Sequence, residues 1–290
     1  MVRDMAASPV IRPMREEDVP AVHELAVLAF EDLARRSGEP PEPRPEPAQA
    51  HVRLRHLVRT DAGGAWVAEA GGAVVGSALA LVREGVWGLS LLVVAPALQS
   101  AGLGGRLLRR AHAHANRARG RIVLSSDDPR ALRAYARLGL QVHPALYATG
   151  VPAGVSPPAG VREGGRADIP LTAGVDRYVR GAAHGGDIDA LLAAGATLLV
   201  LPERGYAVIR RASPGLLAAV DEPAARDLLR AVLARADGET VTVDWLTAGQ
   251  DWAVEVCLDA GLELRAGRGA LFLGGDVGPF RPYLPSGAYL

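Results

Sequence analysis

The spacing of apolar and polar residues predicts a chain that alternates short strands with helices. Apolar runs of strand length occupy residues 10–14, 65–70, 73–82, 86–95, 121–125 and 140–143. Apolar residues at helical spacing, or runs of good helix formers, occupy residues 19–35, 48–59, 106–119 and 130–138. The pair Gly71-Gly72 separates two of the strands and predicts a hairpin turn. The pattern therefore predicts a folded α/β domain.

The stretch that leads from residues 86–95 into the next helix carries the clearest chemical signal. Pro96 ends the strand because proline cannot donate to a strand ladder, and the loop Gln99-Ser-Ala-Gly102-Leu-Gly104-Gly105 follows. A helix that begins at such a loop presents free N–H groups and the positive end of its dipole to an anion. Glycines let the backbone approach that anion without a Cβ in the way. The stretch therefore predicts a phosphate-binding site.

Two common phosphate loops do not fit this stretch. A Walker A loop requires a lysine, and the chain contains none. A dinucleotide fingerprint requires Gly-x-Gly-x-x-Gly, whereas the spacing here is Gln99-x-x-Gly102-x-Gly104. This spacing resembles the acetyl-CoA pyrophosphate loop of the GCN5-related N-acetyltransferases, the GNAT family. The lead-in at residues 92–96, Leu-x-Val-x-Pro, is similar to that family as well.

A second motif follows the loop at the separation found in the same family. Family members carry Asn-x-x-Ala, then a tyrosine four residues later, then Gly-Phe. This chain reads Asp128-x-x-Ala131, then Tyr135, then Gly139-Leu140. It departs from the family in its aspartate and in the leucine of the last pair. The resemblance covers about residues 8–150.

The resemblance implies a fold, a co-substrate and a set of site residues. The implied fold is α/β, with two tandem GNAT-like domains, each a mixed, mostly antiparallel central sheet flanked by helices. The implied co-substrate is acetyl-CoA, with its acetyl oxygen and pantetheine arm on the backbone near Leu92 and Val94, and its pyrophosphate on residues 99–105. The implied cofactor-binding residues are Leu92, Val93, Val94, Gln99, Ser100, Ala101, Gly102, Leu103, Gly104, Gly105, Arg106, Asp128 and Tyr135.

Several of these side chains have a second interpretation. Tyr135 is the implied general acid, which would protonate the leaving thiolate, but its ring also suits packing inside a helix. Asp128 also suits a helix cap, because Asp-Pro is a typical helix start. Arg106, with Arg109 and Arg110, either reaches the 3′-phosphate of CoA or lies on a solvated basic face.

The proton acceptor for the substrate amine stays open. The family often uses a carboxylate on the central strand, and the run 86–91 contains none. Glu84, Ser90 acting through a water molecule, and solvent are the alternatives. His51 and His56 lie on the helix that flanks the expected acceptor cleft, where a solvated histidine is the other interpretation.

The second half of the chain carries a weaker echo of the first. Strands are predicted at residues 198–202, 205–210, 216–220 and 240–243, and a helix at 223–236. Gln250-x-x-Ala253, Cys257 and Gly261-Leu262 have the same offsets as the second motif. The echo indicates an internal repeat at the scale of a domain.

The repeat has lost the glycine loop. Residues 221–227 stand in its place and read Asp-Glu-Pro-Ala-Ala-Arg-Asp, whose carboxylates would repel a phosphate. We therefore predict an acetyl-CoA-binding GNAT domain at 1–150, a linker at 151–165 and a degenerate GNAT-like domain at 166–290.

Composition narrows the function further. Lys+Arg and Asp+Glu both number 32, so the chain lacks the excess positive charge of a binder of nucleic acids or anionic membranes. A single cysteine excludes an internal disulfide framework and a cysteine-rich zinc site, and fits a reducing, cytoplasmic setting. No signal peptide or membrane-spanning run is evident. The lysine-free composition, rich in alanine, arginine and glycine, suggests a GC-rich bacterial genome.

The sequence thus predicts an acetyl-CoA-dependent N-acetyltransferase that transfers acetyl from the thioester to a primary amine by direct attack. The alternative is a CoA-binding sensor or regulatory protein that has kept the phosphate loop and lost catalysis. The expected partner is a small-molecule or peptide amine acceptor, with no nucleic acid, membrane or metal. The oligomeric state stays open, a homodimer included.

Overall fold

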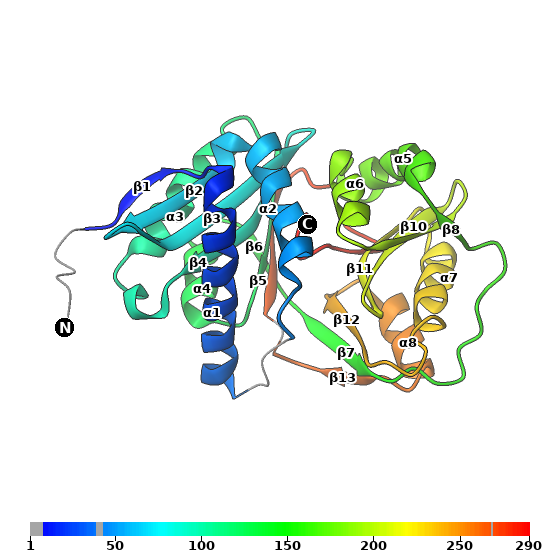
Figure 1. Cartoon of the computed structure of the whole chain (residues 1–290). Helices are drawn as coiled ribbons and strands as arrows, with labels where there is room; N and C mark the ends of the chain where they lie inside the picture. The colour runs from blue at the N-terminus through cyan, green and yellow to red at the C-terminus, as the bar shows by residue number, and fades with distance from the viewer. Residues whose placement is uncertain (1–7, 39–42, 268) are drawn as a thin grey trace. The chain divides into compact units, whose positions relative to one another are not determined.

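The computed structural model describes residues 8–38, 43–267 and 269–290 (Figure 1). The chain forms two compact units, one of residues 1–82 with 87–118 and one of residues 83–86 with 119–290. Each unit is described by itself below.

The first unit holds a sheet and the helices that pack with it. Its strands, given in their order across the sheet, are β1 (Val10–Pro13), β2 (Ala65–Ala70), β3 (Ala73–Arg83) and β4 (Val86–Val94). Its helices are α1 (Val19–Ser37), α2 (Pro47–Thr60) and α3 (Leu103–His112), with short 3-10 helices η1 (Glu16–Asp18), η2 (Ala62–Gly64), η3 (Pro96–Leu98) and η4 (Ala113–Ala115). β2 is antiparallel to both β1 and β3. α1 packs on α2, and α3 packs on β2.

Glycines close the turns of this unit as the sequence predicts. Gly71 and Gly72 have φ angles of 58° and 78°, in the left-handed region, and they form the turn between β2 and β3. α1 ends at Gly38, whose φ of 73° terminates the helix in the usual left-handed conformation.

The helix after the glycine loop differs from its predicted range of 106–119. It begins earlier, at Leu103, and ends at His112. Gly104 and Gly105 are tolerated in its first turn because the first four N–H groups of a helix have no partner within the helix.

The second unit contains the remaining elements. Its strands are β5 (Gly120–Ser125), β6 (Gln141–Pro144), β7 (Leu146–Gly150), β8 (Arg162–Gly164), β9 (Thr197–Leu201), β10 (Gly205–Arg210), β11 (Ser213–Ala219), β12 (Val241–Leu246), β13 (Glu263–Arg265), β14 (Ala270–Gly275) and β15 (Tyr283–Leu284). Its helices are α4 (Pro129–Ala136), α5 (Ile169–Arg180), α6 (Gly186–Ala193), α7 (Glu222–Leu233) and α8 (Asp251–Asp259), with the 3-10 helix η5 (Arg166–Asp168).

Two strands of this unit are exchanged between its sheets. β14 lies between β5 and β6 and is antiparallel to both, with Phe272 opposite Val123 on one side and Val142 on the other. β7 follows β6 directly in the sequence, yet it lies between β12 and β13 and is antiparallel to both. Figure 1 shows the green β7 beside the yellow and orange strands of the late sequence. In each of these two groups of three neighbouring strands, the strand in the middle therefore comes from the other half of the sequence.

The pairing of β5 with β14 requires glycine at both ends of β14. Gly269 has a φ of 108°, and a Cβ there would lie 1.9 Å from the carbonyl oxygen of Ser125. Gly275 has a φ of 69°, and a Cβ there would lie 2.1 Å from the carbonyl oxygen of Arg119. Both positions combine a left-handed backbone with a backbone approach that leaves no room for a side chain.

The other sheet of the second unit has the order β15-β11-β10-β9-β8, with every neighbouring pair antiparallel. α7 packs on β10 and β11 and against α8. The core between them is formed by buried aliphatic side chains such as Leu217 of the sheet and Leu228 and Val232 of α7.

These sheets, mixed and mostly antiparallel with helices beside them, confirm the predicted fold class. The predicted strand at 205–210 is β10, and β8 lies inside the segment predicted as a linker, 151–165. The domain limits 1–150 and 166–290 stay predictions, because the exchanged strands cross them and the compact units divide the chain elsewhere. β7, β14, α5 and α6 were not predicted.

Among the residues that the structure describes, no helix has both the length and the apolar character needed to cross a bilayer. In the same part of the chain, no three His, Cys, Asp or Glu side chains are grouped so that they could hold a metal ion.

Candidate functional site

The predicted phosphate loop connects β4 to α3 in the first unit. The backbone turns through η3 directly after β4. The side chain of Gln99 then folds back, and its Nε2 donates to the carbonyl oxygen of Val94 at 3.0 Å. Gln99 therefore fixes the loop to the end of the strand, a role that the sequence motif does not reveal.

The end of the loop leaves the start of α3 open. Ser100 and Gly102 both lie in the left-handed region, with φ angles of 65° and 81°. Gly102 is the N-cap of α3, and no side chain caps the helix there. A Cβ on Gly102 would meet nothing within 4 Å, so the backbone angle, rather than crowding inside the chain, favours glycine at this position. The N–H groups of the first turn are therefore available to an anion.

Gly104 and Gly105 place no side chain between an approaching anion and the first turn of α3. A Cβ on Gly104 would lie 3.6 Å from Cγ2 of Val94, and one on Gly105 would lie 3.8 Å from Nη1 of Arg109. Both distances are ordinary contacts, so neither glycine is required by packing within the chain. Their small size instead keeps the first turn accessible.

The arginines of α3 have partners of their own. Nη2 of Arg106 donates to the carbonyl oxygen of Pro9 at 3.1 Å. The guanidinium of Arg110 lies over the ring of Trp66, 5.4 Å from its centroid, in a cation–π contact. Of the three arginines considered for the 3′-phosphate, two therefore also have structural contacts.

The middle of β4 carries a contact that no pattern in the sequence indicates. Ser90 is 7% exposed, and its Oγ accepts a hydrogen bond from Nη2 of Arg53 at 2.7 Å. The same nitrogen donates to the carbonyl oxygen of Ser90. The serine hydroxyl that could relay a proton through water thus already accepts from a cation, which lowers its basicity.

Glu84, the other side chain considered as a base, lies in the second unit and is fully engaged. Its carboxylate accepts a bidentate pair of hydrogen bonds from the guanidinium of Arg177, the shorter at 2.6 Å, and a third hydrogen bond from the backbone N–H of Ala183 at 3.0 Å. These donors hold the pKa of Glu84 below its usual value. The residue is therefore a poor proton acceptor.

A pair of histidines lies between α1 and α2. The rings of His23 and His51 meet edge to face, with centroids 5.3 Å apart, and His23 is buried. Burial, the neighbouring His23 and Arg55 together lower the pKa of His51. His51 is therefore more strongly biased toward the neutral imidazole than a free histidine is.

The two remaining predicted site residues lie on α4 in the second unit. Asp128 is the N-cap of α4, and its Oδ1 accepts from the backbone N–H of Arg130 at 2.9 Å. Tyr135 is 6% exposed, and its ring meets that of Phe272 edge to face at 5.8 Å. Within the described residues its hydroxyl makes no hydrogen bond, and burial followed by the charge of Asp128 raises its pKa. Both side chains therefore have the structural contacts that the sequence offered as their second interpretation.

Comparison with known proteins agrees with the fold. Residues 21–140 match the model of the acetyltransferase (GNAT) family. No curated protein sequence matches the chain. A solved structure of a candidate acetyltransferase from Pyrococcus horikoshii superposes with a TM-score of 0.78 at 15% identity, covering 100% of this chain and 99% of its own.

Two further solved structures span nearly the whole chain. A tandem GNAT protein from the clavulanic acid biosynthesis pathway has a TM-score of 0.56 at 14% identity, and the match covers 92% of this chain and 98% of that one. A GCN5-related N-acetyltransferase from Sphaerobacter thermophilus has a TM-score of 0.56 at 16% identity, covering 97% and 98%. Residues 21–140 therefore form a domain of the acetyltransferase (GNAT) family. The fold of the whole chain is that of GNAT proteins, and one of the similar structures is a tandem GNAT protein.

Proposed function

We propose that this protein is an acetyl-CoA-dependent N-acetyltransferase that holds its co-substrate on the loop between β4 and α3. The observation that carries the proposal is the start of α3 at Gly102, which no side chain caps and where a Cβ would meet nothing within 4 Å. This start fits a pyrophosphate, because an anion at a helix N-terminus satisfies donors that otherwise have no partner. Acetyl-CoA, when bound there, supplies the acetyl thioester that the amine attacks.

In the proposed reaction, a neutral amine attacks the acetyl carbon, and the carbon–nitrogen bond forms as the carbon–sulfur bond breaks. Backbone N–H groups of β4 near Leu92 and Val94 are the proposed donors to the acetyl oxygen. One donor aimed at a developing oxyanion typically contributes about 2.7–4 kcal/mol. Since Glu84 and Ser90 are both engaged, the proton of the attacking amine goes to solvent in this proposal.

Tyr135 is the proposed donor of a proton to the departing sulfur. The motif around it supports this role, and so does its free hydroxyl among the described residues. The raised pKa keeps the phenol protonated throughout the neutral range, as a general acid requires. At the equivalent position of the second motif, burial raises the pKa of Cys257 to about 12. The tyrosine of the first motif is thus replaced by a cysteine, and this replacement supports the proposal that residues 166–290 form a degenerate domain.

Calorimetric titration with acetyl-CoA tests where the co-substrate binds. Gly102→Leu should abolish binding, because its side chain would fill the space in front of α3. Gly72→Leu is the matched control: its φ of 78° is close to the 81° of Gly102, and its Cβ position is equally open. The control carries the same backbone strain away from the loop and should keep one site per chain. Equal loss of binding in both variants would contradict the proposed site.

Steady-state kinetics with a panel of small-molecule and peptide amines tests the activity itself. Tyr135→Phe should lower kcat by about 10²–10⁴-fold and leave acetyl-CoA affinity unchanged. Binding of one acetyl-CoA with no turnover of any amine would favour the alternative, a CoA-binding sensor. The absence of a carboxylate from β4 also favours that alternative. The proposed setting is the cytoplasm of a bacterium, because the chain has a single cysteine and a lysine-free composition rich in alanine, arginine and glycine.

A further inference from the structure

The second unit contains a counterpart of the strand and helix that hold the phosphate loop. β11 is followed by α7 as β4 is followed by α3. Residues 95–101 separate the end of β4 from the N-cap of α3, whereas Val220 alone separates the end of β11 from the N-cap of α7. The phosphate loop is therefore absent from the repeat, and its strand meets its helix directly.

An internal carboxylate occupies the start of α7. Oδ1 of Asp221 accepts from the backbone N–H of Ala224 at 2.8 Å and from Nη2 of Arg204 at 2.6 Å. Burial raises the pKa of Asp221, but these two donors outweigh it and the net pKa is lowered. The charge that an external anion would bring to the helix start is thus already present in the chain.

The backbone of β11 is also occupied. Aligning β11 with β4 at their ends makes residues 217–219 the counterparts of residues 92–94, the proposed contacts of the pantetheine arm. β15 runs antiparallel along these positions, with Leu284 opposite Leu217 and Tyr283 opposite Ala218. The N–H of Ala219 donates to the carbonyl oxygen of Pro282 at 3.3 Å.

The segment that begins with β15 is held at both of its ends. Nε2 of Gln250 donates to the carbonyl oxygen of Tyr283 at 2.7 Å. The hydroxyl of Tyr283 donates to the carbonyl oxygen of Leu290 at 2.8 Å, which brings the two ends of the segment together. Tyr283, Tyr289 and Leu290 are among the most deeply buried side chains of the chain.

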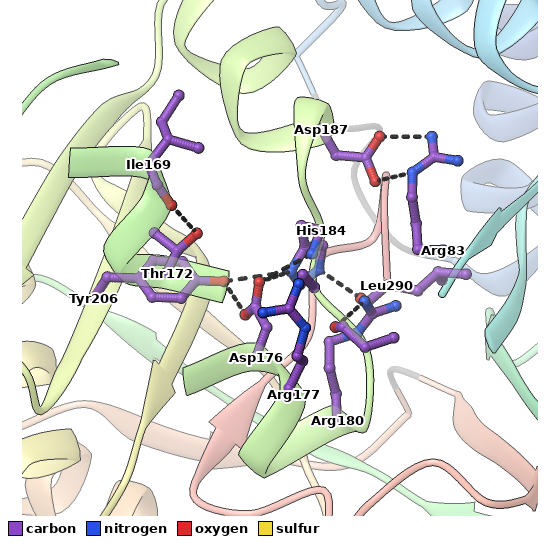
Figure 2. Close-up of polar contacts among 12 residues, drawn as sticks. Arg83, Ile169, Thr172, Asp176, Arg177, Arg180, His184, Asp187, Tyr206 and Leu290 are labelled. Carbon is purple, nitrogen blue, oxygen red and sulfur yellow. Dashed lines mark hydrogen bonds and ion pairs between the residues drawn. The ribbon is translucent and has the colours of Figure 1, made fainter. Parts of the chain in front are cut away.

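A polar cluster formed by α5, the loop that follows it and β10 receives the far end of this segment. Figure 2 shows Asp176, His184 and Tyr206 pointing toward one another, with Leu290 beside them. Nε2 of His184 lies 2.9 Å from the carbonyl oxygen of Leu290, and Nδ1 lies 3.0 Å from Oδ2 of Asp176. The hydroxyl of Tyr206 donates to the other oxygen of Asp176. All four residues are buried, so the cluster acts on the segment rather than on solvent.

We propose that residues 283–290 are an internal peptide ligand of the second half of the chain. They lie along β11 where the proposed function places the arm of acetyl-CoA along β4, and Asp221 takes the position of the pyrophosphate. The second half is then a binding site for an extended peptide with aromatic side chains, recognised by strand addition and by the cluster around His184. It binds no acetyl-CoA while this segment is in place.

Peptide binding tests this inference without acetyl-CoA, so failure of the proposed function would leave the test intact. A chain that lacks residues 283–290 is titrated with a fluorescent peptide of the sequence Tyr-Leu-Pro-Ser-Gly-Ala-Tyr-Leu, followed by anisotropy. We expect saturable binding of one peptide per chain and recovery of the Tm lost on truncation. A peptide of permuted sequence should do neither. Absence of binding to a folded truncated chain would overturn the proposal.

A cleavable full chain keeps the test decisive if the truncated chain does not fold. A protease site is inserted at the exposed Gly278–Pro279 junction, and the chain is cut after folding. After the cut, the chain should keep its segment bound. When the labelled peptide is added in excess, the peptide should replace the segment. Tyr283→Phe, made in the peptide, should weaken binding about threefold to tenfold, because the hydroxyl loses its buried contacts with the carbonyl oxygen of Leu290 and with Nε2 of His184. Release of the segment with no uptake of peptide would refute the proposal.

Discussion

Replacing Phe272 by alanine tests whether the exchanged strand β14 stabilises the sheet formed with β5 and β6. Phe272 is 1% exposed, pairs with Val123 and Val142, and packs its ring on Tyr135. Truncating a buried phenylalanine to alanine typically costs about 3–5 kcal/mol of unfolding free energy. Folded domains are stable by roughly 5–15 kcal/mol, so this loss is a large part of the total.

Hydrogen exchange shows where the stability is lost. The amides of β5 and β6 should exchange about 10²–10⁴-fold faster in Phe272→Ala, because each 1.4 kcal/mol corresponds to a factor of ten. Leu264→Ala on β13 is the control: Leu264 is 38% exposed, so this change should have little effect. Faster exchange confined to β14, with β5 and β6 unchanged, would refute the reasoning that the late strand supports the earlier ones.

Two further changes test single groups. Asp221→Ala should lower the free energy of unfolding by about 0.5–2 kcal/mol in urea denaturation, because α7 loses its cap; an unchanged midpoint would contradict that role. The lowered pKa of His51 means that the folded chain binds this proton less tightly than the unfolded chain. Stability should therefore fall as the pH drops below about 6.5, and His51→Asn should reduce that fall in Tm; an identical acid loss in the variant would contradict the assignment.

Local patterns account for what the sequence predicts well. The hairpin follows from Gly71-Gly72, since two left-handed residues between apolar runs leave few alternatives. The place of the phosphate loop follows from proline and glycine spacing alone. α5 was not predicted because it carries Gly174 in its interior, where glycine disfavours a helix.

Contacts between distant residues account for what the sequence does not predict. The pairing of Arg53 with Ser90 joins a helix to a strand, and no spacing rule connects the two positions. The exchange of β7 and β14 depends on which sheet each strand enters, and short apolar runs of similar length carry no such information. The glycines at the ends of β14 reflect this pairing, but in the sequence they resemble ordinary turn residues.

The proposed loss of a cofactor site from the second half is indicated by the sequence and is given a physical reason by the structure. The acidic residues at 221–227 predict that phosphate does not bind there, but they do not show what occupies the site instead. The structure shows that Asp221 caps α7 and that residues 282–284 pair with β11. Loss of an external ligand leaves donors on a strand and a helix start without partners, and buried donors without partners are costly. A segment of the same chain can satisfy them permanently, which gives selection a physical route from a cofactor site to a structural one.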